Sequence, residues 1–293
     1  MKKRFFSCLA MFLGMFLLLS GVKAEAEATT DWGTKMIKVI GEGVAPAGLP
    51  GAQGRVMAKR AAIADAYRQL AEAVKGVQVD ANTTVEMAMV KSDTISLKVS
   101  ALIKGAQIVS ENVSPDGAYQ VTMQIPMFGA TGGLAEAVIP QPPVVEPLPQ
   151  PAPEVIPSMP ADSNTGGAST VVSIDGGNNS PMGAIGGYTG VIIDCRGLGL
   201  QPVMSPVIKN VKGVKLYGHE NLNYDLVIRD GMADYATNEG MLARAGNRPL
   251  RIKAVRLEDH NANPVISEED GSRILIENGV SGFLNKTAVV FWY

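Results

Sequence analysis

The chain has 293 residues, which is enough for two small domains, and 46% of them are hydrophobic, as in a folded protein. Acidic residues outnumber basic ones by 28 to 26, so the charge gives no basic surface of the kind that binds nucleic acid. There are only two cysteines, Cys8 and Cys195, which excludes a fold held together by several disulfides.

Residues 1–24 are predicted to be an export signal. A basic start at residues 2–4 precedes an apolar stretch, residues 5–19, and small residues follow it. This stretch is short for a membrane span of about 20 residues. We therefore expect transient insertion in the membrane and cleavage near Ala24, Ala26 or Ala28, with an uncleaved inner-membrane anchor as the alternative. Cleavage after Ala24 would remove four basic residues and no acidic ones, which changes the net charge from −2 to about −6.

No lipid is expected on Cys8. Lipid attachment needs a cysteine at the end of the apolar stretch, and Cys8 lies near its start. Cleavage would leave Cys195 as the one remaining cysteine, so no internal disulfide is expected. The mature protein is predicted to be periplasmic or secreted.

Residues 31–137 are predicted to form a first α+β domain. Residues 36–40 have the composition of a strand, and Gly41-Glu42-Gly43 is interpreted as the loop that ends it. Residues 55–75 show apolar residues at helical spacing without internal Gly or Pro, and an alanine-rich side that allows close approach to a sheet. Residues 86–101 suit a helix or a strand equally.

Residues 107–127 are predicted to form a β-hairpin, because two alternating segments flank the turn Pro115-Asp116-Gly117. Alternate residues from Tyr119 to Met127 are apolar, which predicts a sheet with one wet face. Together with a further strand over residues 77–85, this order of elements favours a mainly antiparallel sheet with few helices.

The helix and the strand that follows it also carry a family resemblance. The residues that carry it are Ala58, Ala61, Ala62, Asp65, Ala66, Arg68, Leu70, Gly76, Val77 and Ile103-Lys104-Gly105. They resemble the bacterial envelope domain shared by LPP-twenty-type lipoproteins and the amino-terminal part of the FlgT-type flagellar ring protein. The resemblance implies an exported, non-enzymatic envelope protein, in some members tied to flagella or to the outer membrane. It supplies no catalytic residues.

Residues 138–187 are predicted to be a linker. The stretch from Pro140 to Pro160 is proline-rich and favours an extended polyproline II rod, which at about 3.1 Å per residue would reach roughly 65 Å. The rest of the linker is rich in Gly, Ser and Asn and is expected to be disordered. The sequence therefore predicts two domains held apart by a spacer, as in a tether or an adaptor.

Residues 188–293 are predicted to form a second α+β domain, with a mainly antiparallel sheet and no family resemblance. The expected elements are a buried-type strand at 190–195, a hairpin at 207–217, a short helix or a helix plus turn at 223–237 interrupted at Gly231, strands at 250–257 and 265–266, a helix at 268–277 capped by Ser267 and ended by Asn278-Gly279, and a final strand at 287–292.

One loop of this second domain is a candidate ligand site. A strand that ends in an acidic residue and is followed by a glycine-punctuated loop can bind a phosphate or a metal ion. The candidate ligand residues are Asp194, Arg196, Gly197 and Gly199. A structural turn is the alternative, because neither a Lys-Ser/Thr pair nor a second acidic cluster follows in the sequence.

No motif predicts a catalytic centre. His219 and His260 lie in polar, turn-like segments, and Cys195 ends an apolar strand, where a small buried residue is expected. HExxH, CxxC, GxSxG and Walker motifs do not occur. We therefore expect a protein that is not an enzyme and that has no cofactor and no metal ion.

These observations leave three hypotheses about function. The first is a non-enzymatic exported accessory or assembly protein of the cell envelope, with envelope or flagellar proteins as its partners. The alternative is an exported module that binds a small ligand or a metal ion through the loop at Asp194. The third is a hydrolase with an unrecognised site. The sequence predicts no nucleic-acid partner, and it does not give the oligomeric state.

Overall fold

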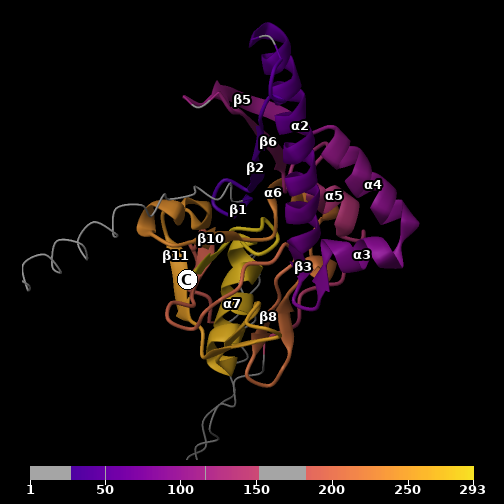
Figure 1. The fold of residues 1–293 in the computed structure, drawn as a ribbon. Coiled ribbons are helices and arrows are strands. Elements are labelled where there is room, and N and C mark those ends of the chain that lie inside the picture. Colours follow the sequence, from indigo (N-terminus) through magenta and orange to yellow (C-terminus); the bar gives the residue numbers. More distant parts are fainter. Residues whose placement is uncertain (1–27, 50, 116, 152–182) are drawn as a thin grey trace, which may run out of the picture.

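The computed structural model describes residues 28–49, 51–115, 117–151 and 183–293. In Figure 1 the first half of the chain, in indigo to magenta, lies above the second half, in orange to yellow, and the two halves are in contact. The predicted α+β class is confirmed. The predicted export signal and the linker residues 152–182 lie outside the described residues. Among the described residues, no helix combines the length and the apolar character needed to cross a membrane.

The first half is a four-stranded antiparallel sheet with one long helix on one of its faces. Its strands are β1 (Thr29–Asp31), β2 (Met36–Gly43), β6 (Tyr119–Pro126) and β5 (Gln107–Val113), in the order β1-β2-β6-β5. Helix α2 (Gly51–Gly76) covers the face on which alternate residues of β2 and β6 are buried. The predicted helix, the predicted hairpin and its alternating pattern are therefore confirmed.

Two glycines of β2 allow α2 to lie directly on the sheet. A Cβ atom at Gly41 would come within 2.2 Å of the Ala62 carbonyl oxygen, and one at Gly43 within 2.2 Å of the Ala58 carbonyl oxygen. The interpretation of these glycines as a loop is wrong, because β2 continues through Gly43. The predicted alanine-rich side is confirmed, since Ala58, Ala62 and Ala66 are buried.

Two short helices form where the pattern of residues 86–101 suits a helix or a strand equally. They are α3 (Val85–Lys91) and α4 (Asp93–Lys104). Each begins at a hydroxyl cap, because Thr84 and Ser92 accept hydrogen bonds from backbone N–H groups three residues further on. Such caps favour a helix over a strand.

A small hairpin takes the place of the strand predicted over residues 77–85. It consists of β3 (Gln78–Asp80) and β4 (Thr83–Thr84), and its tip points toward the second half of the chain. The second half continues the pairing of β3, because the N–H groups of Met204 and Ser205 donate to the Gln78 and Val79 carbonyl oxygens at 3.0 and 2.8 Å.

The centre of the second half is a parallel sheet. Its strands are β10 (Asp234–Ala236), β14 (Val289–Trp292), β7 (Gly190–Asp194) and β11 (Pro249–Lys253), in the order β10-β14-β7-β11. Both faces of this sheet are covered by apolar side chains. Burial on both faces explains why β7 is a continuous apolar run rather than an alternating one.

A second, mixed sheet and two helices complete this half. The strands are β12 (Arg256–Glu258), β13 (Asn263–Ile266), β8 (Ile208–Asn210) and β9 (Lys215–Tyr217), in the order β12-β13-β8-β9. The β8–β9 pair is the predicted hairpin. The helices are α6 (Tyr224–Asp230) and α7 (Glu268–Ser281), and three short 3-10 turns lie at His219–Asn221, Glu239–Met241 and Ala243–Ala245.

Both helices of this half end at a glycine. The interruption predicted at Gly231 is confirmed, because α6 ends at Asp230, Gly231 adopts a φ of 77°, and the chain then enters strand β10. The Ser267 cap of α7 is confirmed, but this helix runs past Asn278 to Ser281. Gly282 then ends it in the left-handed conformation that glycine adopts at low cost.

One hydrophobic core spans both halves, which corrects the expectation that a spacer holds them apart. Trp32 of the first half packs edge-on against Tyr235 of the second, with ring centres 5.4 Å apart. The Gly129 N–H donates to the Ile228 carbonyl oxygen at 3.0 Å. Separation would expose this apolar surface to water, and a long linker does not prevent the two surfaces from meeting.

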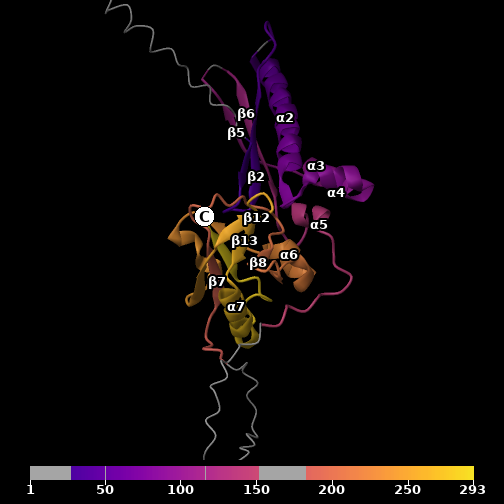
Figure 2. The same cartoon turned by 90° about the horizontal axis from the view of Figure 1, so that it is seen from below.

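The first part of the predicted linker lies along the second half. Figure 2 shows the chain after α5 (Leu134–Val138) passing outside α6. The Glu146 N–H donates to the Glu220 carbonyl oxygen at 2.8 Å, and the half-buried Leu148 packs against the shared core. We call residues 139–151 the strap.

The first described residues of the second half are held by the buried carboxylate of Glu277. Glu277 of α7 accepts hydrogen bonds from the N–H groups of Ile185 and Gly186 at 2.9 and 2.8 Å, and from Nε of Arg273 at 2.9 Å. Burial alone would raise the pKa of Glu277, but these three donors outweigh it and hold the pKa below the ordinary value of 4.5.

Replacing Glu277 by glutamine is expected to lower the free energy of unfolding by about 1–2 kcal/mol, because an amide group would meet backbone donors. A lowered pKa stabilises the folded state above the pKa of the unfolded chain, and this contribution is lost as the pH falls through the folded pKa. Urea unfolding between about pH 7 and pH 3 should therefore show a smaller acid loss for the variant. Glu269→Gln, on the exposed side of the same helix, is the control. Equal unfolding free energies for both variants would contradict this role of Glu277.

Candidate functional site

The predicted ligand loop lies at the carboxyl ends of the parallel strands. Asp194 is the last residue of β7, and its neighbours in the sheet are Lys253 of β11 and Trp292 of β14. Ligands of open parallel sheets bind at this edge, because the loops of several strands converge there. The structure thus joins the predicted loop to two residues that the sequence did not place beside it.

Arg196 already satisfies the carboxylate of Asp194. Its Nε and Nη2 atoms donate to the two carboxylate oxygens at 2.9 and 2.6 Å, and its backbone N–H donates at 3.1 Å. The hydrogen bond from the Arg196 side chain is the main reason that the pKa of Asp194 is lowered. Gly197 and Gly199 both adopt a φ of 78° in the turn that follows. Asp194 therefore serves as the partner of the loop's own arginine.

An aromatic ring gathers two arginines at this edge. The guanidinium carbon of Arg196 lies 3.7 Å from the centre of the Trp292 ring, and that of Arg251 lies 5.7 Å from it. Both distances are within the range of cation–π attraction. Arg251 and Lys253 are exposed on one side of β11, as their alternation in the sequence predicts. We call Arg196, Arg251, Lys253 and Trp292 the basic edge.

Cys195 directly follows β7 and lies in the core. Its side chain is fully buried, and burial raises the pKa of the thiol to about 12. A thiol with this pKa is protonated at neutral pH and is a weak nucleophile. The interpretation of Cys195 as a small buried residue is confirmed.

Cys195 is expected to react with dithiobis(nitrobenzoate) roughly 100-fold more slowly in the folded protein than in the unfolded chain, because the reagent needs an accessible thiolate. The absorbance of the released thiolate at about pH 8 measures this in a chain that starts at Glu25 and therefore lacks Cys8. The same chain in guanidinium chloride is the control. Equal rates in both conditions would show an accessible thiol.

A strained turn of the second half contacts the tip of the β3–β4 hairpin. Asp259, His260 and Asn261 have φ angles of 52°, 58° and 64°, a left-handed conformation that non-glycine residues rarely adopt. Contacts hold it in place, since Lys209 Nζ pairs with Asp259 at 2.6 Å and His260 Nδ1 lies 3.1 Å from the Ala81 carbonyl oxygen. Strain held in this way is concentrated at binding and switching sites.

Two cavities lie on either side of this hairpin tip, which consists of Ala81 and Asn82. One has a volume of about 360 Å³ and is lined by His260, and the other has a volume of about 520 Å³ and is lined by His219 and Asp259. His219 Nδ1 is 3.3 Å from the Ser205 hydroxyl oxygen. The tip separates the two histidines, so they line different cavities and do not share one site.

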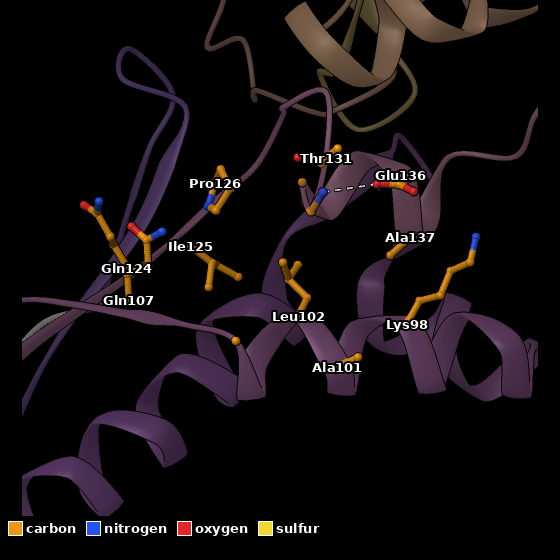
Figure 3. A pocket seen from close by; sticks show the side chains of 13 residues that line it. Lys98, Ala101, Leu102, Gln107, Gln124, Ile125, Pro126, Thr131, Glu136 and Ala137 are labelled. Atoms are coloured by element: carbon orange, nitrogen blue, oxygen red, sulfur yellow. Dashed lines mark hydrogen bonds between the residues drawn. The ribbon is translucent and has the colours of Figure 1, made fainter.

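A third cavity, of about 580 Å³, lies within the first half of the chain (Figure 3). Leu102 and Ile125 lie near its centre, and Lys98 and Glu136 lie at one end. β5 starts only at Gln107, opposite Gln124, so Ile125 and Pro126 at the end of β6 pair with β2 on one side and have no described strand on the other. We call this cavity the α4 groove. Apolar walls with a few polar groups are typical of small-molecule sites.

A polar cluster on another side of the interface ties the two halves together. Arg244 donates five hydrogen bonds, to three backbone carbonyl oxygens, to the carboxylate of Asp234 and to the hydroxyl of Thr287. Lys35 of the first half pairs with the same carboxylate at 2.7 Å. Burial lowers the pKa of Lys35, so this ammonium group is stabilised by the pair rather than by water.

Two known families match different halves of the chain. Residues 36–125 match the LPP20 lipoprotein family. The LPP20 match covers β2 to β6 with helices α2, α3 and α4, and it confirms the LPP-twenty part of the predicted resemblance. It starts after the predicted leader and contains no cysteine.

Residues 190–292 match the second domain of Treponema pallidum Tp0624. This region runs from β7 to β14 and includes the basic edge. No curated protein sequence matches the chain. The LPP20 match indicates an exported, envelope-associated protein.

Proposed function

We propose that this chain is a non-enzymatic accessory or assembly protein of the cell envelope, with a partner in outer-membrane or flagellar structures. The observation that carries the proposal is the LPP20 match of a half that is docked on a second domain through one shared core. Two modules that share one core can present a combined surface to other proteins. The resemblance to the FlgT-type ring protein supports the flagellar branch of the proposal.

Four described side chains that could take part in catalysis, those of Cys195, Asp194, His219 and His260, lie in structural surroundings, and this supports a non-enzymatic role. The Cys195 thiol is buried, and the Asp194 carboxylate is held by Arg196. His219 lies against the Ser205 hydroxyl, and His260 against a backbone carbonyl group. One of these pairs, His219 Nδ1 with the Ser205 hydroxyl at 3.3 Å, brings a base to a hydroxyl group. Among the described residues no carboxylate forms an ion pair with His219, so the third group that orients the base in covalent catalysis is not present beside it.

Fractionation of cells that produce the tagged chain tests this proposal. The protein is expected in the envelope fraction, and chemical cross-linking there should link it to an outer-membrane or flagellar protein. A tagged chain that starts at Glu25 is a suitable control, because it lacks the predicted export signal and should stay in the cytosol. Recovery of the full chain as a free monomer in the culture medium would contradict an envelope role.

A small-ligand module is the second candidate, and the α4 groove is the observation that favours it. Its volume of about 580 Å³ lies within the range of about 300–1,000 Å³ found for ligand pockets. A thermal-shift screen of apolar small molecules should raise the melting temperature of the wild type, because ligands stabilise the state that they bind. Leu102→Glu should abolish that rise. No response of the wild type to any compound would remove this candidate.

A further inference from the structure

The outer side of strand β11 has backbone groups that pair with no strand in the described part of the chain. β11 is the last strand of the parallel sheet, with β7 on its inner side. The Ala254 N–H donates to the Asp194 carbonyl oxygen, so the backbone groups of Ile252 also point toward β7. Those of Arg251 and Lys253 consequently point outward, where no described strand pairs with them.

The same two residues carry positive charges without an acidic partner. Among the described residues, no carboxylate lies within 4.0 Å of the charged groups of Arg251 or Lys253, whereas Arg196 beside them is paired with Asp194. Both side chains are exposed. The half-buried Trp292 lies next to Arg251 and gives this side of the sheet an apolar wall.

Positive charges on an edge strand also protect a sheet from unwanted pairing, because they repel another basic strand and are costly to cover with an apolar one. This protection does not extend to an acidic strand. Its carboxylates would compensate both charges, and its backbone would pair with the outward groups of β11. The basic edge therefore selects its partner by charge.

We propose that the basic edge binds an extended acidic peptide segment of a partner protein as an added strand on β11. Acidic side chains at alternate positions of the added strand lie on one face, at the spacing of Arg251 and Lys253. The partner of the proposed envelope protein would then be a protein with an exposed acidic segment. Only the assumption that the partner is a protein rests on the proposed function.

Fluorescence anisotropy with a labelled peptide of alternating Glu and Val tests the proposal on the purified full chain from Glu25 onward. Saturable binding is expected for this peptide and none for the matching Lys and Val peptide. The double variant R251E/K253E should weaken binding at least about 10-fold, and raising the salt concentration from about 50 to 500 mM should weaken it further. The double variant R60E/K75E changes the net charge equally on exposed α2 positions and should bind as the wild type does.

Several outcomes would overturn this inference. One is the absence of saturable binding to the wild type at low salt, and another is unchanged binding by R251E/K253E when its melting temperature equals that of the wild type. Glu25 and Glu27 give this chain an alternating acidic segment of its own. Tighter peptide binding by E25K/E27K would show that this segment, and not a partner, occupies the edge. Since the test uses purified protein, its failure would leave the envelope role intact.

Discussion

Gly41→Ala is expected to lower the free energy of unfolding by about 3 kcal/mol or more, because its methyl group would overlap the backbone of α2. The new Cβ atom would lie 2.2 Å from the Ala62 carbonyl oxygen and 2.3 Å from the Ala66 backbone nitrogen. Neither atom belongs to a side chain that can rotate away, so the whole helix must shift from the sheet. Urea unfolding followed by circular dichroism measures the loss.

Gly51→Ala is the matched control for this substitution. Gly51 lies in the exposed first turn of α2, and nothing lies within 4 Å of an added Cβ atom there. The control should be neutral or stabilise the protein by up to about 1 kcal/mol, because alanine restricts the unfolded chain. A loss of less than about 1 kcal/mol for Gly41→Ala would mean that helix and strand are not in direct contact.

Arg244→Ala is expected to cost about 3 kcal/mol of stability, because it leaves several buried acceptors without a donor. The side chain of Arg244 is only 13% exposed, and it joins the end of α6 to the segment before β14. Asp234 would keep Lys35 as its partner, which limits the loss. The same urea measurement gives this value.

Arg229→Ala removes a neighbouring arginine that is 53% exposed and pairs with the adjacent Asp230. Exposed pairs of this kind contribute about 0–1 kcal/mol, so the two variants should differ by at least about 2 kcal/mol. Equal losses would show that burial of Arg244 contributes little. Addition of about 1 M salt should reduce the small effect of Arg229→Ala and leave most of the Arg244→Ala effect.

The sequence predicted best those elements whose pattern is local. The periodicity of α2, the alternation of β6 and the Ser267 cap of α7 each depend on residues a few positions apart. The parallel order of the second sheet depends on pairings between distant strands, and a single sequence carries no signal for it. The α+β class with mainly antiparallel pairing still held for the chain as a whole.

The candidate sites show the same division. The loop of Asp194 and Arg196 was identified from an acidic strand end followed by glycines, but Trp292 reaches it from a strand far along the chain. The interpretation of Gly41-Glu42-Gly43 as a loop is wrong for a related reason, because its glycines allow a close contact with α2 that the local sequence does not reveal. The left-handed turn at Asp259–Asn261 contains no glycine, so the sequence does not predict it, and tertiary contacts stabilise it.

The strap and the bonds of Glu277 attach the two ends of residues 152–182 to the same half of the molecule. The length of that segment consequently has no influence on the distance between the two modules. Doubling it would cost only about 0.6 kcal/mol of loop-closure entropy. Deletions, fluorescent inserts or an affinity tag placed between Pro151 and Gly183 should therefore be tolerated by the docked body, which makes this segment a convenient position for a reporter.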